Sequence, residues 1–257
     1  MIMKKNFLPI IALALSATAC VSDADLDVAD NKGFINVSVS ADNSMETRAE
    51  QTVSDFSDWA ITVRKSSEAN DITWSSGKAF AAGTYSVTAK RFGGEDQAYT
   101  QNDSWGDAYY EGTTTESVTV VAGKSADATI KCGQAKNARL KVTVNSLPEA
   151  FTEVSVVANN AANTRTLTFN SSTNNKPAYF MATEQVSYTL KYKYNGTDKL
   201  NSGVITMKGA ATENIITVSA NDNGLISVTI KYDDAFGNGN SSTIIIDAAT
   251  GEQVSNS

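Results

Sequence analysis

Few side chains in this sequence are suited to catalysis. The chain contains no histidine, so a serine or cysteine nucleophile would lack its usual general base. A pair of carboxylates could cleave a glycosidic bond, but such an enzyme usually needs a sizeable cleft built by long loops. We therefore expect no enzyme, no cofactor and no metal centre, and we rank a carboxylate-based hydrolase as the weakest alternative.

The clearest group of ligand-binding side chains lies in residues 98–112, AYTQNDSWGDAYYEG. Tyr99, Trp105 and Tyr109 offer flat rings, and Asp103 is one of the nearby groups that accept hydrogen bonds from hydroxyls. Rings of this kind beside polar neighbours are typical of sugar-binding loops. Core packing is the competing interpretation, because Tyr109 and Tyr110 run into an expected strand and at least one ring should point inward.

Two short segments, residues 221–224 and 233–240, are rich in Asn, Asp and Gly, as calcium loops are. Neither segment has the spaced ligands or the closing glutamate of an EF-hand loop. Asn and Asp bond to their own backbone in turns, and Gly supplies positive φ. We therefore interpret both segments as turns rather than as metal sites.

Cys20, one of the two cysteines, lies where an export signal would be cut. Lys4 and Lys5 precede an apolar run at residues 7–15 that ends in small residues, which is the layout of a secretory signal. A membrane-spanning helix needs ~20 apolar residues, and this run is about half as long. We expect residues 1–19 to be a signal peptide.

The residues around Cys20 resemble the lipobox of bacterial lipoproteins, in which this thiol receives a diacylglycerol and the new amine a further acyl chain. Ala17 stands where the common box has Leu, a departure that the Bacteroidota box allows, and ordinary signal cleavage is the alternative. Each buried methylene contributes ~0.8 kcal/mol to membrane affinity, so several chains make release rare. The resemblance implies an outer membrane lipoprotein exposed on the cell surface.

Residues 20–32 form an acidic tether after the expected anchor. The tether also resembles the acidic tag that directs Bacteroidota lipoproteins to the outer face of the outer membrane. A plain solvated linker is an equally good interpretation, since acidic segments with few apolar residues do not fold by themselves. The aspartates in question are Asp23, Asp25, Asp27 and Asp30.

The overall charge argues against one class of partner. The net charge is −7, whereas nucleic-acid partners need clustered Lys and Arg. If Cys20 carries lipid, Cys132 has no partner for a disulfide within the chain, so stability must come from packing.

Apolar and polar residues alternate at period two along most of the chain, as in half-buried strands. Residues 35–39, 126–132 and 186–192 show this pattern, and no stretch shows sustained helical periodicity with caps. The sequence therefore predicts an all-β chain with one or two turns of helix at most.

The same order of segments occurs twice in the mature chain. Ile230 follows Ile130 by 230 − 130 = 100 residues, a period of domain size. Residues 122–124 and 221–224 each separate two alternating runs, which predicts two hairpins. We expect two tandem antiparallel β-sandwich domains, Ig-like in general plan, at residues 33–133 and 134–257. The corresponding pairs are residues 35–39 and 140–144, 56–61 and 151–156, 85–90 and 186–191, and 118–132 and 216–232.

The phrases GFINVSVSA, AAGTYSVTAK, YYEG, VTVVAGKSADATIKC and ARLKVTVN resemble a family of Bacteroidota cell-surface lipoproteins, domain of unknown function 4493. That family is similar to the fimbrillin-like proteins, whose two domains are transthyretin-like sandwiches. The family has no assigned reaction. The resemblance implies a surface adhesin, a pilus component or a pilus anchor.

The string METRA at residues 45–49 resembles the site at which fimbrillins are cut after an arginine. A cut between Arg48 and Ala49 would remove the strand at residues 35–39 and open a groove, which a strand from a neighbouring subunit could fill. Residues 243–247 are the candidate donor. The favoured alternatives are that Arg48 is an exposed loop residue and that residues 243–247 complete the second domain of their own chain.

We therefore predict a non-catalytic, lipid-anchored surface protein that acts in adhesion or as a fimbrial component or anchor. The alternative is a surface glycan-binding lipoprotein that uses residues 98–112. The expected partners are the outer membrane, through the lipid, and either other fimbrial subunits, by strand addition, or surface glycans.

Overall fold

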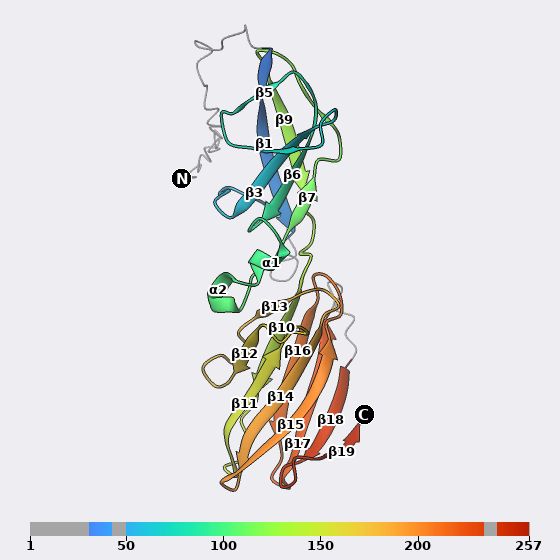
Figure 1. The fold of residues 1–257 in the computed structure, drawn as a ribbon. Coiled ribbons are helices and arrows are strands. Elements are labelled where there is room, and N and C mark those ends of the chain that lie inside the picture. Colours follow the sequence, from blue (N-terminus) through green and yellow to red (C-terminus); the bar gives the residue numbers. More distant parts are fainter. Residues whose placement is uncertain (1–30, 43–49, 234–240, 257) are drawn as a thin grey trace, which may run out of the picture.

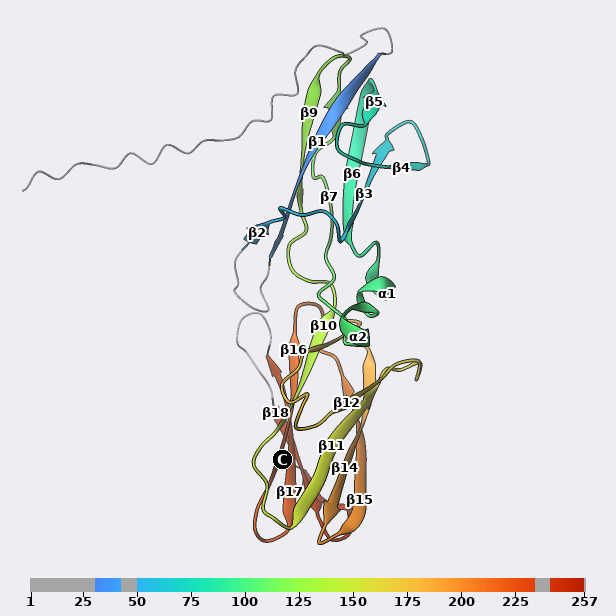
Figure 2. The same cartoon turned by 90° about the vertical axis from the view of Figure 1, so that its left-hand side faces the viewer.

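The computed structural model describes residues 31–42, 50–233 and 241–256. Within them the chain forms strands and two short helices, and the strands make four sheets. Figures 1 and 2 show two sheet pairs stacked end to end, with the helices between them. The prediction of an all-β chain is confirmed, and the four sheets are consistent with two β-sandwiches. No helix in the described ranges is both long and apolar enough to cross a membrane.

The first sandwich contains a four-stranded and a five-stranded sheet. In the smaller sheet, β1 pairs in antiparallel fashion with β2 and β5 and in parallel with β9. In the larger sheet, β6 lies between β3 on one side and β7 and β8 on the other. The strands are β1 (Lys32–Asp42), β2 (Glu50–Thr52), β3 (Trp59–Lys65), β4 (Asp71–Thr73), β5 (Ala79–Ala81), β6 (Gly83–Arg91), β7 (Glu111–Thr113), β8 (Val118–Val120) and β9 (Ser125–Lys131).

The second sandwich contains a six-stranded sheet in the order β13-β10-β16-β17-β18-β19 and a four-stranded sheet in the order β12-β11-β14-β15. Its strands are β10 (Ala138–Val144), β11 (Phe151–Asn159), β12 (Thr166–Phe169), β13 (Ala178–Phe180), β14 (Gln185–Tyr194), β15 (Thr197–Thr206), β16 (Glu213–Ala220), β17 (Leu225–Asp233), β18 (Ser241–Asp247) and β19 (Gln253–Asn256).

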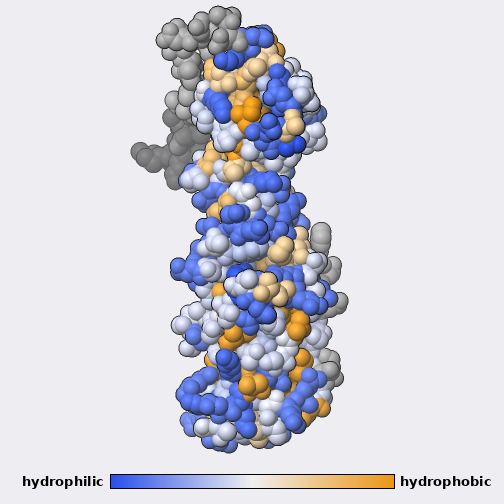
Figure 3. All heavy atoms as spheres, viewed as in Figure 1, coloured by the Kyte–Doolittle hydropathy of each residue, from blue (hydrophilic) through white to orange (hydrophobic). Residues whose placement is uncertain are grey.

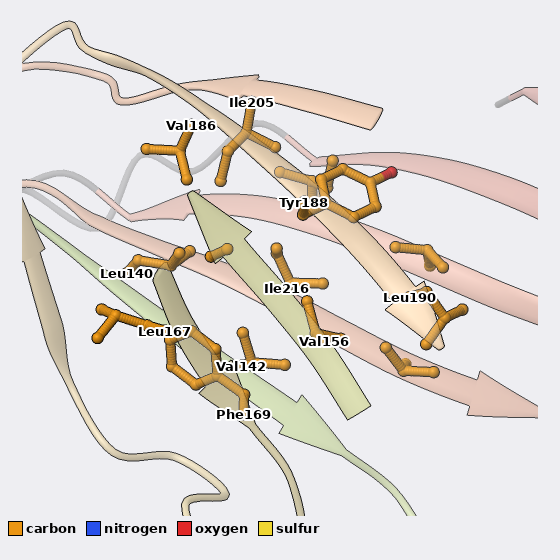
Figure 4. Packing of buried hydrophobic residues seen from close by; sticks show 14 of the residues in the cluster. Leu140, Val142, Val156, Leu167, Phe169, Val186, Tyr188, Leu190, Ile205 and Ile216 are labelled. Carbon is orange, nitrogen blue, oxygen red and sulfur yellow. The ribbon is translucent and has the colours of Figure 1, made fainter. Parts of the chain in front are cut away.

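Period-two alternation builds each core. In β14, Val186, Tyr188 and Leu190 are buried, while the residues between them are half-buried. Figure 4 shows these side chains in one cluster with Val156 and Ile216 from other strands of the second sandwich. Full burial of an aliphatic side chain contributes about 1.5–3 kcal/mol, so a core of this size can hold a sandwich without a disulfide.

The two sandwiches share one pairing scheme. β1 and β9 pair in parallel, as β10 and β16 do, while β3 pairs with β6 as β11 pairs with β14. The predicted equivalences of residues 35–39 with 140–144 and of 85–90 with 186–191 are confirmed, since they fall in β1 and β10 and in β6 and β14.

One of the two predicted hairpins is wrong. The turn at residues 221–224 does join the antiparallel strands β16 and β17, but β8 and β9, which flank residues 122–124, belong to different sheets. Val120 and Ile130 are both buried, because each faces the core from its own sheet. The turn therefore crosses between sheets, and β9 corresponds to β16 rather than to β17. Strands β17, β18 and β19 have no counterpart among the described residues of the first sandwich.

The described chain starts at the end of the first sandwich that lies away from the second. Lys32 pairs with Ala81 there, while Asp42, at the other end of β1, donates its N–H to the Gly133 carbonyl beside the second sandwich (Figure 1). The opposite end of the molecule is the distal pole, defined as residues 145–150, 195–196, 221–224 and 248–252. Its loops are bonded together, for example from Ala248 N to Gly224 O at 2.9 Å.

Candidate functional site at the joint between the two sandwiches

The aromatic segment singled out in the sequence lies between the two sandwiches. Residues 95–110, the joint segment, connect β6 to β7 and contain the single-turn helices α1 (Glu95–Ala98) and α2 (Gln101–Ser104) (Figure 1). Asn102 and Asp103 have φ values of 51° and 55°, in the left-handed region that Asn and Asp tolerate better than most residues. The left-handed turn at α2 brings the chain to Trp105.

Trp105 inserts into the core of the second sandwich. Its side chain is 8% exposed, and its ring meets Phe169 edge to face at 4.9 Å between centroids. The Lys176 ammonium lies 4.4 Å from the same ring centroid, within the range of a cation–π contact. A side chain from the connection between β6 and β7 therefore completes a core made mainly by β10–β18.

Arg165, in the loop before β12, holds the joint segment from the other side. Its Nε donates to Ser104 O at 2.6 Å, one terminal nitrogen donates to Trp105 O at 2.7 Å, and the other donates to Tyr179 O. The planar guanidinium can reach three carbonyls at once, which a lysine ammonium on a flexible stem does less well. Arg165 therefore satisfies backbone acceptors of both sandwiches.

The guanidinium is also enclosed by rings. It lies 4.7 Å from the ring centroid of Phe180 and 5.6 Å from that of Tyr99. Burial lowers the pKa of Arg165 to about 10, with Glu184 and Tyr99 acting in the opposite direction. Arg165 is therefore still protonated at neutral pH and keeps all of its donors.

Asn137, at the start of the second sandwich, closes the joint on the linker side. Its side chain is fully buried, with Oδ1 accepting from Tyr109 N at 3.0 Å and Nδ2 donating to Asp107 O at 2.8 Å. Lys136 N donates to Tyr109 O at 2.8 Å, and Arg91 pairs with the Asp107 carboxylate at 3.2 Å. The backbone of the joint segment is thus bonded to the second sandwich at residues 104–105 and again at residues 107–109.

The four predicted ligand-binding residues do not share one hollow. Tyr109 is buried, its hydroxyl donates to Glu111 at 2.8 Å, and burial raises its pKa. Asp103 and Trp105 line a hollow of about 320 Å³, whereas Tyr99 lines another of about 310 Å³. The prediction of a sugar site therefore stays a prediction, and it applies best to Tyr99.

The hollow beside Tyr99 is lined mainly by residues with polar or charged groups, and several of these groups already have partners. The Tyr99 hydroxyl donates to Glu95 at 2.7 Å, and burial raises the pKa of Tyr99. Both carboxylate oxygens of Glu184 accept backbone N–H groups, from Ala161 at 3.2 Å and Met181 at 3.1 Å. A wider hollow of about 670 Å³ lies near the distal pole, lined by charged residues that include Glu153 and Lys193.

Three further predicted site residues, Cys20, Arg48 and Ala49, lie outside the described residues. The candidate donor strand is described: β18 pairs with β17 on one side and β19 on the other within the same chain. Cys132 is a buried free thiol. Within the described ranges, no three His, Cys, Asp or Glu side chains are grouped so that they could hold a metal ion.

The fold and the joint define a protein made of two β-sandwiches joined end to end by an inserted tryptophan and a half-buried arginine. Residues 31–256 match the family described as domain of unknown function, DUF4493. The chain belongs to this family, as the sequence phrases predict. No curated protein matches the chain.

Several solved structures are similar in fold. A candidate cell adhesion protein from Bacteroides ovatus ATCC 8483 is 11% identical, with a TM-score of 0.40, covering 77% of this chain and 95% of that one. A candidate cell adhesion protein from Bacteroides eggerthii DSM 20697 is 9% identical, with a TM-score of 0.40 and coverages of 74% and 86%. A fimbrial assembly protein from Parabacteroides distasonis ATCC 8503 is 10% identical, with a TM-score of 0.36 and coverages of 85% and 97%.

Proposed function

We propose that this chain is a cell-surface protein, held to the outer membrane by lipid on Cys20, that acts in adhesion or as a component or anchor of a fimbria. The observation that carries the proposal is the end-to-end stack with a bonded joint. Because β1 starts at the end remote from the second sandwich, a membrane tether ahead of Lys32 would leave the distal pole farthest from the membrane.

Several features support the distal pole as the contact region. It collects loops from both sheets of the second sandwich, and loops held by a rigid scaffold commonly carry binding residues. On the face shown in Figure 3 the surface is mainly hydrophilic with separated apolar patches, so a lipid anchor rather than a broad apolar face would supply membrane affinity.

The anchor is tested with Cys20→Ser in cells that make the full chain. We expect that the variant protein incorporates no radiolabelled palmitate and that it is released from the membrane fraction. Protease treatment of intact cells should then digest the unsubstituted protein without lysis. Unchanged palmitate uptake in the variant would refute the anchor, and resistance to protease until the outer membrane is broken would refute surface exposure.

The fimbrial form of the proposal depends on strand exchange. Ile35 and Val39 of β1 are 3% and 1% exposed, so loss of β1 would uncover the first core along this strand. A donated β18 would have to leave β17 and β19, with which it is paired in this chain. Exchange therefore needs an energetic gain that exceeds the loss of two ladders.

Mass spectrometry of protein extracted from the cell surface separates the two forms. A fimbrial subunit should yield a product that begins at Ala49 and multimers that survive detergent, and Arg48→Gln should abolish both. A monomeric adhesin or anchor should keep an intact lipidated N-terminus and yield no such multimers.

Glycan binding is the second candidate, and the hollow beside Tyr99 is the observation that favours it. Trp105→Ala is a poor test because it would also disturb the second core. Tyr99→Ala should instead reduce binding on a glycan array, while Asp103→Ala, on a separate hollow, serves as the comparison. Equal glycan binding by the unsubstituted protein, Tyr99→Ala and Asp103→Ala would exclude Tyr99 as a contact residue.

A further inference from the structure

β9 is the outer strand of its sheet although its counterpart in the second sandwich is not. Among the described residues β9 pairs only with β1, and Figure 2 shows it at the margin of the first sandwich. The equivalent strand β16 pairs with β10 on one side and with the antiparallel strand β17 on the other. The comparison shows that this strand position can accept an antiparallel neighbour, and that the described part of the first sandwich supplies none.

Alternate residues of β9 direct their backbone N–H and C=O groups away from β1, so these groups form a row on the outer side of the strand. Lys124 O accepts from Phe34 N at 3.0 Å, and Cys132 N donates to Ser40 O at 2.8 Å. Even-numbered residues of this stretch therefore bond to β1, and the N–H and C=O groups of the odd-numbered residues point the other way. An unpaired row of this kind is a template for another strand.

The same odd-numbered residues carry a charge pattern that complements itself. Ser125, Asp127, Thr129 and Lys131 are all exposed. If two copies of β9 pair in antiparallel fashion with Thr129 opposite Thr129, Asp127 of each copy lies opposite Lys131 of the other. The pair therefore contains two such contacts between opposite charges. Opposite charges directly across a ladder stabilise it, and like charges destabilise it.

We propose that β9 pairs with β9 of a second copy of this chain, antiparallel and centred on Thr129. The two four-stranded sheets then join into one continuous sheet across a twofold axis. The joined edge gives each odd-numbered backbone group of β9 a partner, as β17 does for β16.

The charges of Asp127 and Lys131 favour a second copy of β9 over an unrelated strand. Charged residues on an edge discourage unspecific strand addition, since most incoming strands leave them without a partner. A second copy of β9, paired in a single register, places an opposite charge across from both Asp127 and Lys131. Asp127 also accepts from Asn36 Nδ2 of β1 at 3.0 Å.

Cysteine cross-linking in cells that make the full chain tests the register. Thr129→Cys places two cysteines opposite each other about 5.5 Å apart at Cα, within reach of a disulfide. We expect a dimer band on a non-reducing gel for this variant. The unsubstituted chain and Thr119→Cys, whose residue is exposed on β8 in the other sheet, should give none. An absent band, or an equal band for Thr119→Cys, overturns the proposal.

Charge reversal in the Thr129→Cys background tests whether the strand that pairs with β9 is β9 of a second copy. Asp127→Lys alone and Lys131→Asp alone should each weaken the dimer band about tenfold, because like charges then face each other at two places. Both changes together should restore the band. Thermal unfolding of each variant checks that the fold is retained, and failure of the double variant to restore dimers overturns the pairing. Neither result depends on Cys20 or on adhesion, so the proposed function is tested separately.

Discussion

At the residue scale, two side chains hold the two sandwiches together at the joint. Trp105 fills part of a core that belongs to another sandwich, and Arg165 donates to carbonyls on both sides of the boundary. Arg165 acts where apolar packing alone would leave the carbonyls of Ser104, Trp105 and Tyr179 without donors, at a cost of about 1–3 kcal/mol per group. The joint therefore depends on shape and on hydrogen bonding together.

Trp105→Ala should destabilise the second sandwich by about 3–5 kcal/mol, as expected for loss of a buried tryptophan. Urea unfolding followed by circular dichroism measures the change. Asp103→Asn, two residues away, exposed and equally tolerant of the positive φ at this position, should change the unfolding free energy by less than about 0.5 kcal/mol. Equal effects of the two substitutions would mean that the indole does not support the core.

The Cys132 thiol should be unreactive in the folded protein. Burial raises its pKa from 9.0 to about 11, and its side chain is 3% exposed. At pH 8 this shift lowers the thiolate fraction about a hundredfold, and alkylation requires the thiolate. Iodoacetamide should therefore modify the native Cys20→Ser variant far more slowly than the urea-unfolded variant, with the native rate rising as pH approaches 11. Comparable rates at pH 8 would contradict the burial.

The sequence predicts only part of this site. The composition of residues 98–112 points to the joint segment and to an inward ring at Tyr109 or Tyr110, and both rings are buried. Arg165 is not predictable, because a single arginine in a loop sixty residues away carries no periodic or motif signal. Its role exists only once the two sandwiches meet.

At the element scale, alternation predicts strands well but not the sheet to which each belongs. Val118 and Val120 alternate with polar residues in the same way as Ala128 and Ile130, yet β8 and β9 face each other across the core. A turn that crosses between sheets and a turn that closes a hairpin need the same residues, Gly above all. The repeat at 100 residues therefore aligned β9 with the wrong strand.

The crossing turn lies tightly against the start of β1. A Cβ at Gly33 would stand 2.3 Å from Val121 O and 2.6 Å from Lys124 O. Gly33→Ala should thus shift this turn from β1 and destabilise the first sandwich by about 1–3 kcal/mol in urea unfolding. Gly94→Ala is the matched control, since its Cβ would meet only the flexible end of Gln97. A Gly33→Ala protein as stable as the control would show that the turn can move freely.

At the scale of the whole molecule, the joint makes two cores behave as one rod. Side chains from each sandwich contact the other, with Trp105 in the second core and Tyr179 in the first. The repeat at 100 residues predicts two domains of this size but contains no information on the angle between them. That angle follows from the joint segment and Arg165, which the repeat does not duplicate.

Arg165→Met keeps most of the apolar volume but removes the donors to Ser104, Trp105 and Tyr179. We expect each sandwich to stay folded while small-angle X-ray scattering shows a shorter and broader distribution of interatomic distances. Lys193→Met, which breaks an exposed ion pair with Glu153 near the distal pole, should leave the scattering unchanged. Identical curves for both variants would mean that Trp105 alone sets the angle.

The parallel pairing of β1 with β9 has a consequence for the order of events during synthesis. Phe34 lies beside Ser125, 125 − 34 = 91 residues further along the chain. β1 leaves the ribosome early, but its apolar side has no permanent cover until β9 has followed, and contacts between such distant residues form slowly. The first sandwich must therefore close after its whole length is available, so the nascent chain spends that interval with an uncovered apolar strand that chaperones would need to shield.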